Sequence, residues 1–294
     1  MNNQPDVSVI IPAYNEGNII TSVINGVHLM MDRLDRTYEI LVINDGSTDD
    51  TPEKAQSAGA MVISHPYNIG NGAAVKTGIR QAKGRFLVMM DGDGQHSPEY
   101  IPQLLEKVGP YDMVVGARTS ASESYFHRNI ANGLYNHFAS YICNRKIQDL
   151  TSGFRAIKAD IARQFVALLP NTFSYPTTMT MAILRSGFSL AYVPIKANRR
   201  TGKSKIKLLR DGSRFFLIIL KIATLFSPMR VFLPVSFAMF LTGIGYGLFK
   251  IFFMGSRYGP TSAMLMTISV LIFMVGLVSE QITQLHYDRS EKRD

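Results

Sequence analysis

Two long apolar stretches near the C-terminus constrain the fold of this chain more than any other feature. Residues 231–249 are uncharged and mostly apolar, and residues 258–279 form a second uncharged stretch. Each is close to the roughly 20 residues that a helix needs to cross the hydrocarbon core of a bilayer. No polar face interrupts either stretch, which argues against two core helices of a soluble protein. The sequence therefore predicts two transmembrane helices in a hairpin.

The distribution of charge predicts how this hairpin is oriented. The chain has a net charge of +9, and residues 201–294 carry 12 Lys and Arg against 5 Asp and Glu. These cations flank both ends of the hairpin, whereas the connection between the stretches offers only Arg257, with Lys250 at its edge. The positive-inside rule then places both ends in the cytoplasm. Basic residues beside apolar segments indicate anionic lipid as the partner and argue against nucleic acid.

The segment before the hairpin, residues 203–230, mixes basic side chains with Phe, Leu and Ile, which predicts helices lying in the membrane interface. The N-terminus has no basic region followed by a long apolar run, so no secretory signal is expected. We predict a multi-pass protein of the inner (cell) membrane, with its globular domain and both termini cytoplasmic. Its predicted parts are a cytosolic domain (1–202), an interfacial amphipathic segment (203–230), a transmembrane hairpin (231–282) and a cytosolic tail (283–294).

The first two thirds of the chain alternate between two patterns. Short runs rich in Val, Ile and Met have the length of strands and cover residues 7–12, 38–43, 60–64, 85–90 and 112–116. Longer segments of helical period lie between them, at residues 16–32, 49–58, 71–83 and 98–108. This alternation predicts a parallel sheet covered by helices on both faces. Ligands bind such sheets at the carboxyl ends of the strands, where this chain places its polar motifs.

An acidic pair follows the fourth predicted strand. Asp91 and Asp93 stand at positions i and i+2, so both carboxylates can reach one cation from a turn. Mg²⁺ and Mn²⁺ prefer oxygen ligands and are usually held by one or two carboxylates together with substrate phosphates. Gln95 continues the alternation and can add an amide oxygen. The sequence predicts a site for Mg²⁺ or Mn²⁺ formed by Asp91, Asp93 and Gln95.

A second nucleotide interpretation rests on the segment from Gly70 to Val75. It resembles a dinucleotide fingerprint, with Asp91 about 20 residues further on, and would indicate an NAD-linked oxidoreductase. However, Val75 replaces the third glycine, and residues 65–69 separate the glycines from the preceding strand. We favour glycines that let the start of a helix pack closely on a neighbour, and retain the oxidoreductase as a minor alternative.

Five motifs in order, VSVIIPAYNE, NDGSTDDT, DGDGQH, DLTSGFR and RRTGKSK, resemble those of family 2 glycosyltransferases. Within that family they are similar to the polyprenyl-phosphate branch, which includes dolichol-phosphate mannosyltransferase and bacterial undecaprenyl-phosphate enzymes. The resemblance implies an α/β fold of the GT-A type, with a Rossmann-like, mostly parallel sheet and helices on both faces. Juxtamembrane amphipathic helices and two transmembrane helices would follow this domain.

The resemblance also implies an activity. An inverting, metal-dependent glycosyltransferase would move a hexose from a UDP- or GDP-linked sugar to undecaprenyl or dolichyl phosphate at the cytoplasmic membrane face. Transfer to another membrane lipid or to a polysaccharide is the alternative. A processive polysaccharide synthase normally carries a Q-x-x-R-W motif, and this chain has no tryptophan. The sequence leaves the oligomeric state open, with a homo-oligomer among the alternatives.

Site roles follow from the resemblance, position by position. The nucleotide sugar would contact Pro12, Ala13, Tyr14, Glu16, Asp45, Asp91 and Lys205. The acceptor phosphate would contact Arg118, Arg128, Ser152 and Arg155. Catalysis would rest on Asp93, Asp149 and Arg199. Because a phosphate acceptor is already ionised, a strong base is hardly needed, and Asp149 either acts as a base or orients the acceptor.

Overall fold

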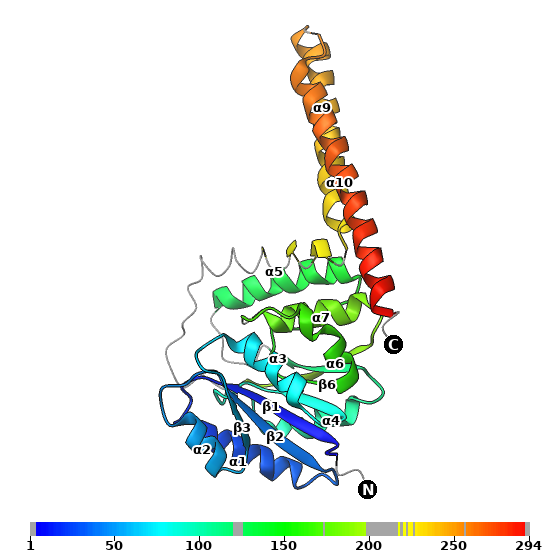
Figure 1. Cartoon of the computed structure of the whole chain (residues 1–294). Helices are drawn as coiled ribbons and strands as arrows, with labels where there is room; N and C mark the ends of the chain where they lie inside the picture. The colour runs from blue at the N-terminus through cyan, green and yellow to red at the C-terminus, as the bar shows by residue number, and fades with distance from the viewer. Residues whose placement is uncertain are drawn as a thin grey trace. The chain divides into compact units, whose positions relative to one another are not determined.

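The computed structural model describes residues 4–119, 126–172, 174–197, 217, 220–221, 223–225, 227–255 and 257–291 (Figure 1). For residues 126–132, 134 and 286–291 only the backbone is described. The chain divides into two compact units, Met1–Phe215 and Phe216–Asp294. Most of the interfacial segment predicted over 203–230, together with Arg199 and Lys205, lies outside the described residues.

A seven-stranded sheet forms the centre of the first unit. Its strands lie in the order β3-β2-β1-β4-β6-β5-β7. Strand β6 is antiparallel to both of its neighbours, and every other pair of adjacent strands is parallel. All strands except β6 therefore end at the same edge of the sheet. The strands are β1 (Val7–Ala13), β2 (Tyr38–Asn44), β3 (Met61–Ser64), β4 (Phe86–Met89), β5 (Met113–Arg118), β6 (Arg155–Lys158) and β7 (Leu190–Ile195).

Helices cover both faces of this sheet, which confirms the predicted fold class. Figure 1 shows α1 and α2 on one side of the sheet and α3, α6 and α7 on the other. Strands β1 and β4 are buried along their whole length, because helices lie on both of their faces. The helices are α1 (Ile20–Met31), α2 (Thr51–Ser57), α3 (Asn71–Gln81), a 3-10 turn (Pro98–Tyr100), α4 (Ile101–Lys107), α5 (Phe126–Cys143), α6 (Ala159–Phe165), a second 3-10 turn (Val166–Leu168) and α7 (Tyr175–Arg185).

The five strands and four helical segments expected from the sequence are all present, but the sequence does not predict β6 and β7. Strand β6 has only four residues and begins and ends with a basic residue, Arg155 and Lys158. Strand β7 contains Pro194, which removes a backbone donor. Both strands are imposed by pairing: β6 lies between β4 and β5, and β7 pairs with β5.

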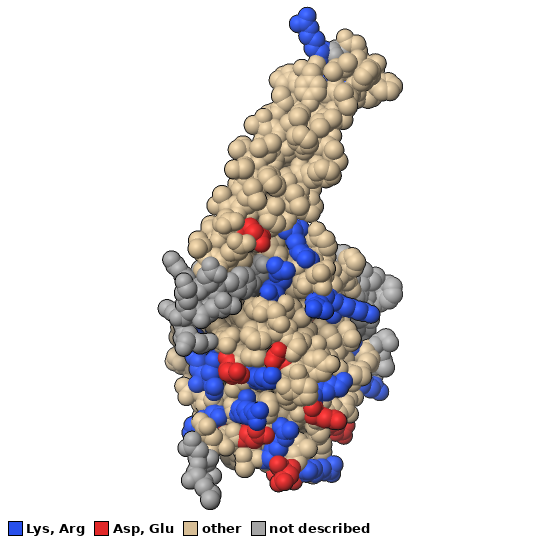
Figure 2. Space-filling model, turned by 90° about the vertical axis from the view of Figure 1, so that its right-hand side faces the viewer, with Lys and Arg blue, Asp and Glu red and all other residues tan. Residues whose placement is uncertain are grey.

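The second unit contains a hairpin of two long helices, α9 (Met229–Met254) and α10 (Pro260–Glu291). By length and composition, Met229–Met254 and Pro260–Leu285 could each span a membrane. Figure 2 shows a long stretch of this hairpin without charged side chains. Many of its large apolar side chains are exposed, Phe252 and Phe253 most of all. A surface of this kind is suited to lipid rather than to water.

Small residues at intervals of seven bring the two hairpin helices together. In α10 these residues are Ser262, Ser269 and Gly276, all of them buried, and the next in the series, Thr283, donates to the Leu225 carbonyl before α9. A Cβ placed on Gly276 would lie 2.7 Å from Cβ of Phe232 in α9. Transmembrane helices approach closely where small residues line the contact, and a period of seven keeps one seam facing the partner.

Gly276→Leu is therefore expected to destabilise the hairpin by about 1–3 kcal/mol, because the new side chain collides with Phe232. Thermal unfolding of the purified protein in a mild detergent measures this effect. Gly245→Leu is the matched control, since a Cβ at Gly245 meets nothing within 4 Å. Equal melting temperatures for the two variants would contradict close packing at Gly276.

Candidate active site

The loops that follow β1 and β2 are joined by hydrogen bonds. The Asn15 N–H donates to Ser47 Oγ (3.0 Å), and the Thr48 N–H donates to Asn15 Oδ1 (2.8 Å). The Glu16 N–H donates to Thr51 Oγ1 at 2.9 Å. These bonds place the first two sequence motifs side by side at the carboxyl edge of the sheet. Asn15 has a positive φ of 56°, a conformation that asparagine tolerates better than most residues.

Other residues predicted to contact the nucleotide lie on or near these loops. Pro12 and Ala13 end β1 and are buried, whereas Tyr14 and Glu16 follow them and are partly exposed. The Gly92 N–H donates to the Pro12 carbonyl at 3.3 Å, which brings the acidic loop after β4 alongside β1. Three separate motifs thus meet at one edge of the sheet.

Asp45 is buried at the end of β2 and both of its oxygens are engaged within the protein. Oδ1 accepts a hydrogen bond from the Ile69 N–H (3.0 Å) and lies 2.7 Å from His65 Nδ1. Oδ2 accepts from the Gly70 N–H at 2.8 Å. On its other side, His65 Nε2 lies 2.9 Å from Thr77 Oγ1. Asp45 therefore fixes the segment between β3 and α3, and its contact with a nucleotide stays a prediction.

The glycines at the start of α3 face another part of the protein. A Cβ on Gly70 would lie 2.3 Å from the Asn171 carbonyl oxygen, and one on Gly72 would lie 2.1 Å from that of Pro170. Close packing of a helix start, the favoured interpretation of this segment, is confirmed. It also brings Asn71 into the site, where its Nδ2 donates to Asp91 Oδ1 at 3.4 Å. Sequence reasoning missed Asn71 and His65, because no local pattern marks either residue.

The acidic pair lies in the loop directly after β4. The Asp91 side chain is 29% exposed, and Asp93 Oδ1 accepts a hydrogen bond from the Gln95 N–H at 3.1 Å. Behind the loop, the buried His96 ring stacks on Phe154 with 5.2 Å between ring centroids. Burial lowers the pKa of His96 and outweighs the opposing effect of the nearby carboxylates. The histidine is therefore neutral at neutral pH.

The residues around Asp91 fit a divalent cation. No group of three or more His, Cys, Asp or Glu side chains in the described part of the chain could hold a metal ion by itself. Asp91 and Asp93 nevertheless offer carboxylate oxygens, and Gln95 offers an amide oxygen. A Cβ on Gly153 would lie 2.9 Å from Asp91 Oδ2, so only a residue without a side chain fits beside this carboxylate. Mg²⁺ commonly binds through one or two carboxylates and completes its shell with water and substrate phosphates.

An ion pair lies beside the acidic loop, between the end of β5 and the loop before β6. Arg118 Nε and Nη2 donate to the two oxygens of Asp149 at 2.7 and 2.9 Å. Nη2 also donates to Thr151 Oγ1 at 2.6 Å. Burial alone would raise the pKa of Asp149, but Arg118 and backbone N–H groups lower it below its usual value. Asp149 is thus a firmly ionised carboxylate, ill suited to serve as a general base near neutral pH.

Two other residues predicted to contact the acceptor phosphate are buried, whereas contact with a ligand requires an accessible side chain. Ser152 is 1% exposed and Arg155 is 0% exposed. The Arg155 guanidinium donates to the carbonyls of Ser152 and Pro176 and to Thr180 Oγ1. In this arrangement Arg155 has no surface on which to bind a ligand. The sequence prediction did not anticipate this burial, because arginine is seldom fully enclosed.

The remaining predicted residues are placed only in part. Arg128 lies on α5, but its side chain is outside the described residues, as are Arg199 and Lys205. Their expected roles toward the acceptor and the diphosphate therefore stay predictions.

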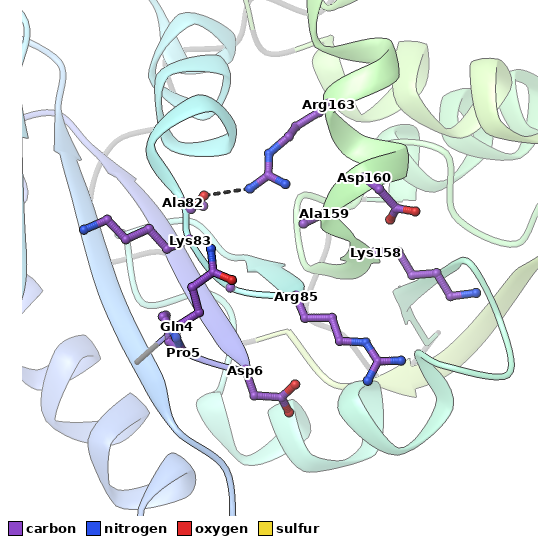
Figure 3. A pocket seen from close by; sticks show the side chains of 11 residues that line it. Gln4, Pro5, Asp6, Ala82, Lys83, Arg85, Lys158, Ala159, Asp160 and Arg163 are labelled. Atoms are coloured by element: carbon purple, nitrogen blue, oxygen red, sulfur yellow. Dashed lines mark hydrogen bonds between the residues drawn. The ribbon is translucent and has the colours of Figure 1, made fainter. Parts of the chain in front are cut away.

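A cavity of about 730 Å³ lies at the opposite edge of the sheet, near the start of β1 and β4 (Figure 3). Its charged groups largely serve internal contacts: Lys158 pairs with Asp112, Asp6 pairs with Arg36, and Arg163 donates to the Ala82 carbonyl. None of the predicted site residues lines this cavity. The strand ends, rather than this cavity, form the candidate active site.

The sheet topology, with β6 antiparallel between β4 and β5, and the acidic loop after β4 define the fold as one of the GT-A type. The crystal structure of glucosyl-3-phosphoglycerate synthase from Mycobacterium tuberculosis, in complex with Mn²⁺, UDP and phosphoglyceric acid, superposes with a TM-score of 0.61. It is 19% identical in sequence and covers 74% of this chain and 78% of that chain. At this identity the likeness shows the fold alone.

The sequence profile described as "Glycosyl transferase family 2" matches residues 8–165, and the chain belongs to this family of glycosyltransferases. A second profile, "GtrB C-terminal hairpin", matches residues 227–285. The undecaprenyl-phosphate 4-deoxy-4-formamido-L-arabinose transferase of Sodalis glossinidius is 25% identical over 96% of this chain and 90% of its own length. Glycosyltransferase AglJ of Haloferax volcanii is 28% identical over 98% and 97%. The resemblance to family 2 and to its polyprenyl-phosphate branch is confirmed.

Proposed function

We propose that this protein transfers a hexose from a UDP- or GDP-linked sugar to a polyprenyl phosphate, with inversion at the anomeric carbon, at the cytoplasmic face of the membrane. One observation carries the proposal: an acidic pair suited to a divalent cation lies next to the Arg118–Asp149 ion pair, whose arginine is partly exposed, in a chain with two long apolar helices. The name of the Sodalis glossinidius relative supports the class of acceptor. The M. tuberculosis complex with UDP and Mn²⁺ supports the class of donor and the cofactor.

In this proposal the acidic loop binds the diphosphate end of the donor. Asp91, Asp93 and Gln95 would hold Mg²⁺ or Mn²⁺, and the ion would supply positive charge toward the departing nucleoside diphosphate. Tyr14 and Glu16, on the loop tied to the NDGS motif, line the nucleoside pocket together with Pro12, Ala13 and Asp45. Arg199 and Lys205 add positive charge toward the diphosphate.

The acceptor phosphate is placed by the loop at the end of β5. Arg118 holds Asp149 through Nε and Nη2, and its third guanidinium nitrogen, Nη1, is assigned to the phosphate, with Arg128 as a second ligand. With Nε and Nη2 held by Asp149, Nη1 offers the phosphate a charge-assisted hydrogen bond from a single nitrogen, and Arg128 supplies the other donors. The acceptor oxygen is already ionised near neutral pH. The lowered pKa of Asp149 therefore suits a positioning role toward Arg118 better than that of a base.

The test is an assay of the purified full-length protein in detergent against a panel of UDP- and GDP-linked hexoses. Undecaprenyl phosphate, dolichyl phosphate and a lipid without a phosphate serve as acceptors. We expect transfer from at least one donor to a polyprenyl phosphate and none to the lipid without phosphate. Hydrolysis of the donor without any lipid product, or transfer to a polysaccharide, would overturn the proposal.

The orientation of the hairpin is a separate prediction. In intact cells, a membrane-impermeant thiol reagent should label Arg257→Cys, in the connection between α9 and α10, but not Ser57→Cys on α2 of the first unit. The physical reason is that Lys and Arg are concentrated in the segments that flank the two ends of the hairpin, and basic segments beside transmembrane helices stay on the cytoplasmic side. Both substitutions are made in a Cys143→Ala background, which removes the single native cysteine.

Permeabilised cells provide the control. Ser57 and Arg257 are both exposed, so a cysteine at either position should be labelled once the reagent can enter the cell. If only Ser57→Cys were labelled in intact cells, the hairpin would have the opposite orientation, with the first unit outside the cell. A cytosolic nucleotide sugar could then no longer be the donor.

A further inference from the structure

The most unusual buried group in the first unit is the guanidinium of Arg155, at the start of β6. It is completely enclosed, and its hydrogen-bond acceptors are neutral: the carbonyls of Ser152 and Pro176, Thr180 Oγ1 and the Met113 sulfur. Among the ion pairs of the described residues, none includes Arg155. Burying a cation without a carboxylate partner is costly. A well-packed apolar residue would fill this space at a lower cost, so space filling alone does not account for the arginine.

Arg155 holds one end of the loop that carries the DLTSG motif. It donates to the Ser152 carbonyl, and its guanidinium lies 5.9 Å from the ring centre of Tyr175. The Tyr175 hydroxyl in turn donates to the Gly153 carbonyl at 3.4 Å. Arg155 and Tyr175 thus secure two successive carbonyl groups of this loop.

The other end of the same loop is secured by Asp149. Its Oδ1 accepts hydrogen bonds from the backbone N–H groups of Thr151 and Ser152, each at 3.1 Å. Held from both ends, the loop cannot shift without breaking several buried hydrogen bonds.

The point of the loop that faces the acidic pair is Gly153. A Cβ at this position would lie 2.9 Å from Asp91 Oδ2 and 3.2 Å from the Tyr175 hydroxyl. The bare Cα of Gly153 therefore forms the wall against which the Asp91 carboxylate rests. Asn71 Nδ2 contacts the other oxygen of Asp91, which leaves the carboxylate held on two sides.

We propose that Arg155, acting with Tyr175, is a positioning residue that seats Gly153 against Asp91 and so sets the orientation of that carboxylate toward a divalent cation. The inference rests on the proposed function, because it assigns Asp91 to the metal. It replaces the predicted contact of Arg155 with the acceptor phosphate, for which the side chain has no exposed surface. Groups that orient a metal ligand from behind typically change metal affinity by 10–100-fold when they are removed.

The test measures Mn²⁺ binding directly, without turnover. Free Mn²⁺ is followed by electron paramagnetic resonance while the purified protein is titrated in detergent, alone and with UDP or GDP. Arg155→Met, which keeps much of the length but loses the charge and the donors, should weaken Mn²⁺ binding by about 10-fold or more. Tyr175→Phe, which loses only the hydroxyl, should weaken it by a smaller factor. Arg155→Lys, which keeps the charge and one donor group, should recover part of the loss.

Arg163→Met is the matched control, because Arg163 is exposed, lies near the opposite edge of the sheet and donates to a backbone carbonyl. It should bind Mn²⁺ as the wild type does. In transfer assays, Arg155→Met should need more Mn²⁺ for half-maximal rate and recover much of its rate at saturating Mn²⁺. A merely structural role would instead lower the melting temperature and leave the Mn²⁺ affinity unchanged, which would overturn the inference.

If Arg155→Met fails to fold, Tyr175→Phe and Arg155→Lys decide the question, since wild-type Mn²⁺ affinity in both would also overturn it. Failure of the proposed function gives a different result. A wild-type protein that binds Mn²⁺ but transfers no sugar would contradict the function while leaving the Arg155 comparison intact. A wild-type protein that binds no Mn²⁺, with or without nucleotide, would contradict both.

Discussion

Asp93→Asn is expected to lower the transfer rate by about 10²-fold or more, and excess chelator to abolish transfer until Mg²⁺ or Mn²⁺ is restored. The substitution keeps the size of the side chain but removes the negative charge that binds the cation. Charge that develops on the departing diphosphate is then less well neutralised. Initial rates of lipid glycosylation at saturating donor, measured over a range of metal concentrations, test the prediction.

Asp160→Asn supplies the control for a lost surface carboxylate. Asp160 is exposed on α6 and lines the cavity at the opposite edge of the sheet, away from the acidic loop. It should transfer at the wild-type rate and respond to chelator in the same way. Full wild-type activity in excess chelator would contradict the assignment of a metal to Asp91 and Asp93.

Arg118→Met should destabilise the protein by about 3–5 kcal/mol, because it leaves the buried Asp149 carboxylate without its charged partner. The double variant Arg118→Met with Asp149→Leu should be more stable than the sum of the two single effects, since no unpaired charge then remains. Chemical denaturation of the purified protein measures this coupling. If the changes in the free energy of unfolding caused by the two substitutions were additive, Arg118 and Asp149 would not stabilise each other.

Activity separates the structural role of this pair from its proposed role in binding. The double variant should regain stability relative to Arg118→Met but should remain impaired in transfer, because the guanidinium assigned to the acceptor phosphate is still missing. Recovery of both stability and transfer would contradict that assignment.

The same pair predicts how stability depends on pH. The pKa of Asp149 is lower in the folded protein than its ordinary value of 3.8. Its contribution is therefore complete above that value and is lost as the pH falls through the lower pKa of the folded state. Asp149→Asn should flatten this acid limb of the stability curve.

Much of the architecture could be predicted from local sequence patterns. The alternation of apolar runs and helical periods predicts β1 to β5 and the helices between them, because burial against a layer on each face leaves a periodic record in the sequence. The two uncharged stretches predict α9 and α10 for a different reason, since their length matches the thickness of a bilayer and no polar face interrupts them. The order of the motifs also predicts that their polar residues meet at one edge of the sheet, since parallel strands share a carboxyl edge.

The candidate site was predicted less completely, and the differences have a common cause. Asp91 and Asp93 lie where the sequence places them. Arg118 and Asp149 are 31 residues apart and pair only because β6 inserts between β4 and β5. The Asp45 carboxylate contacts His65 and the backbone N–H of Gly70 before α3, and no local sequence pattern predicts these contacts.

Local sequence patterns therefore determined the apolar helical hairpin, the parallel strands and the edge of the sheet where the polar motifs gather. The tertiary structure alone decided which of those polar side chains face the open site and which are enclosed. Arg155 shows this most clearly: as the last residue of the DLTSGFR motif it is a phosphate ligand by family resemblance, yet the chain encloses it completely. The orientation of a side chain in a buried loop depends on partners distant in sequence, here Pro176 and Thr180 on α7, and only folding brings those partners together.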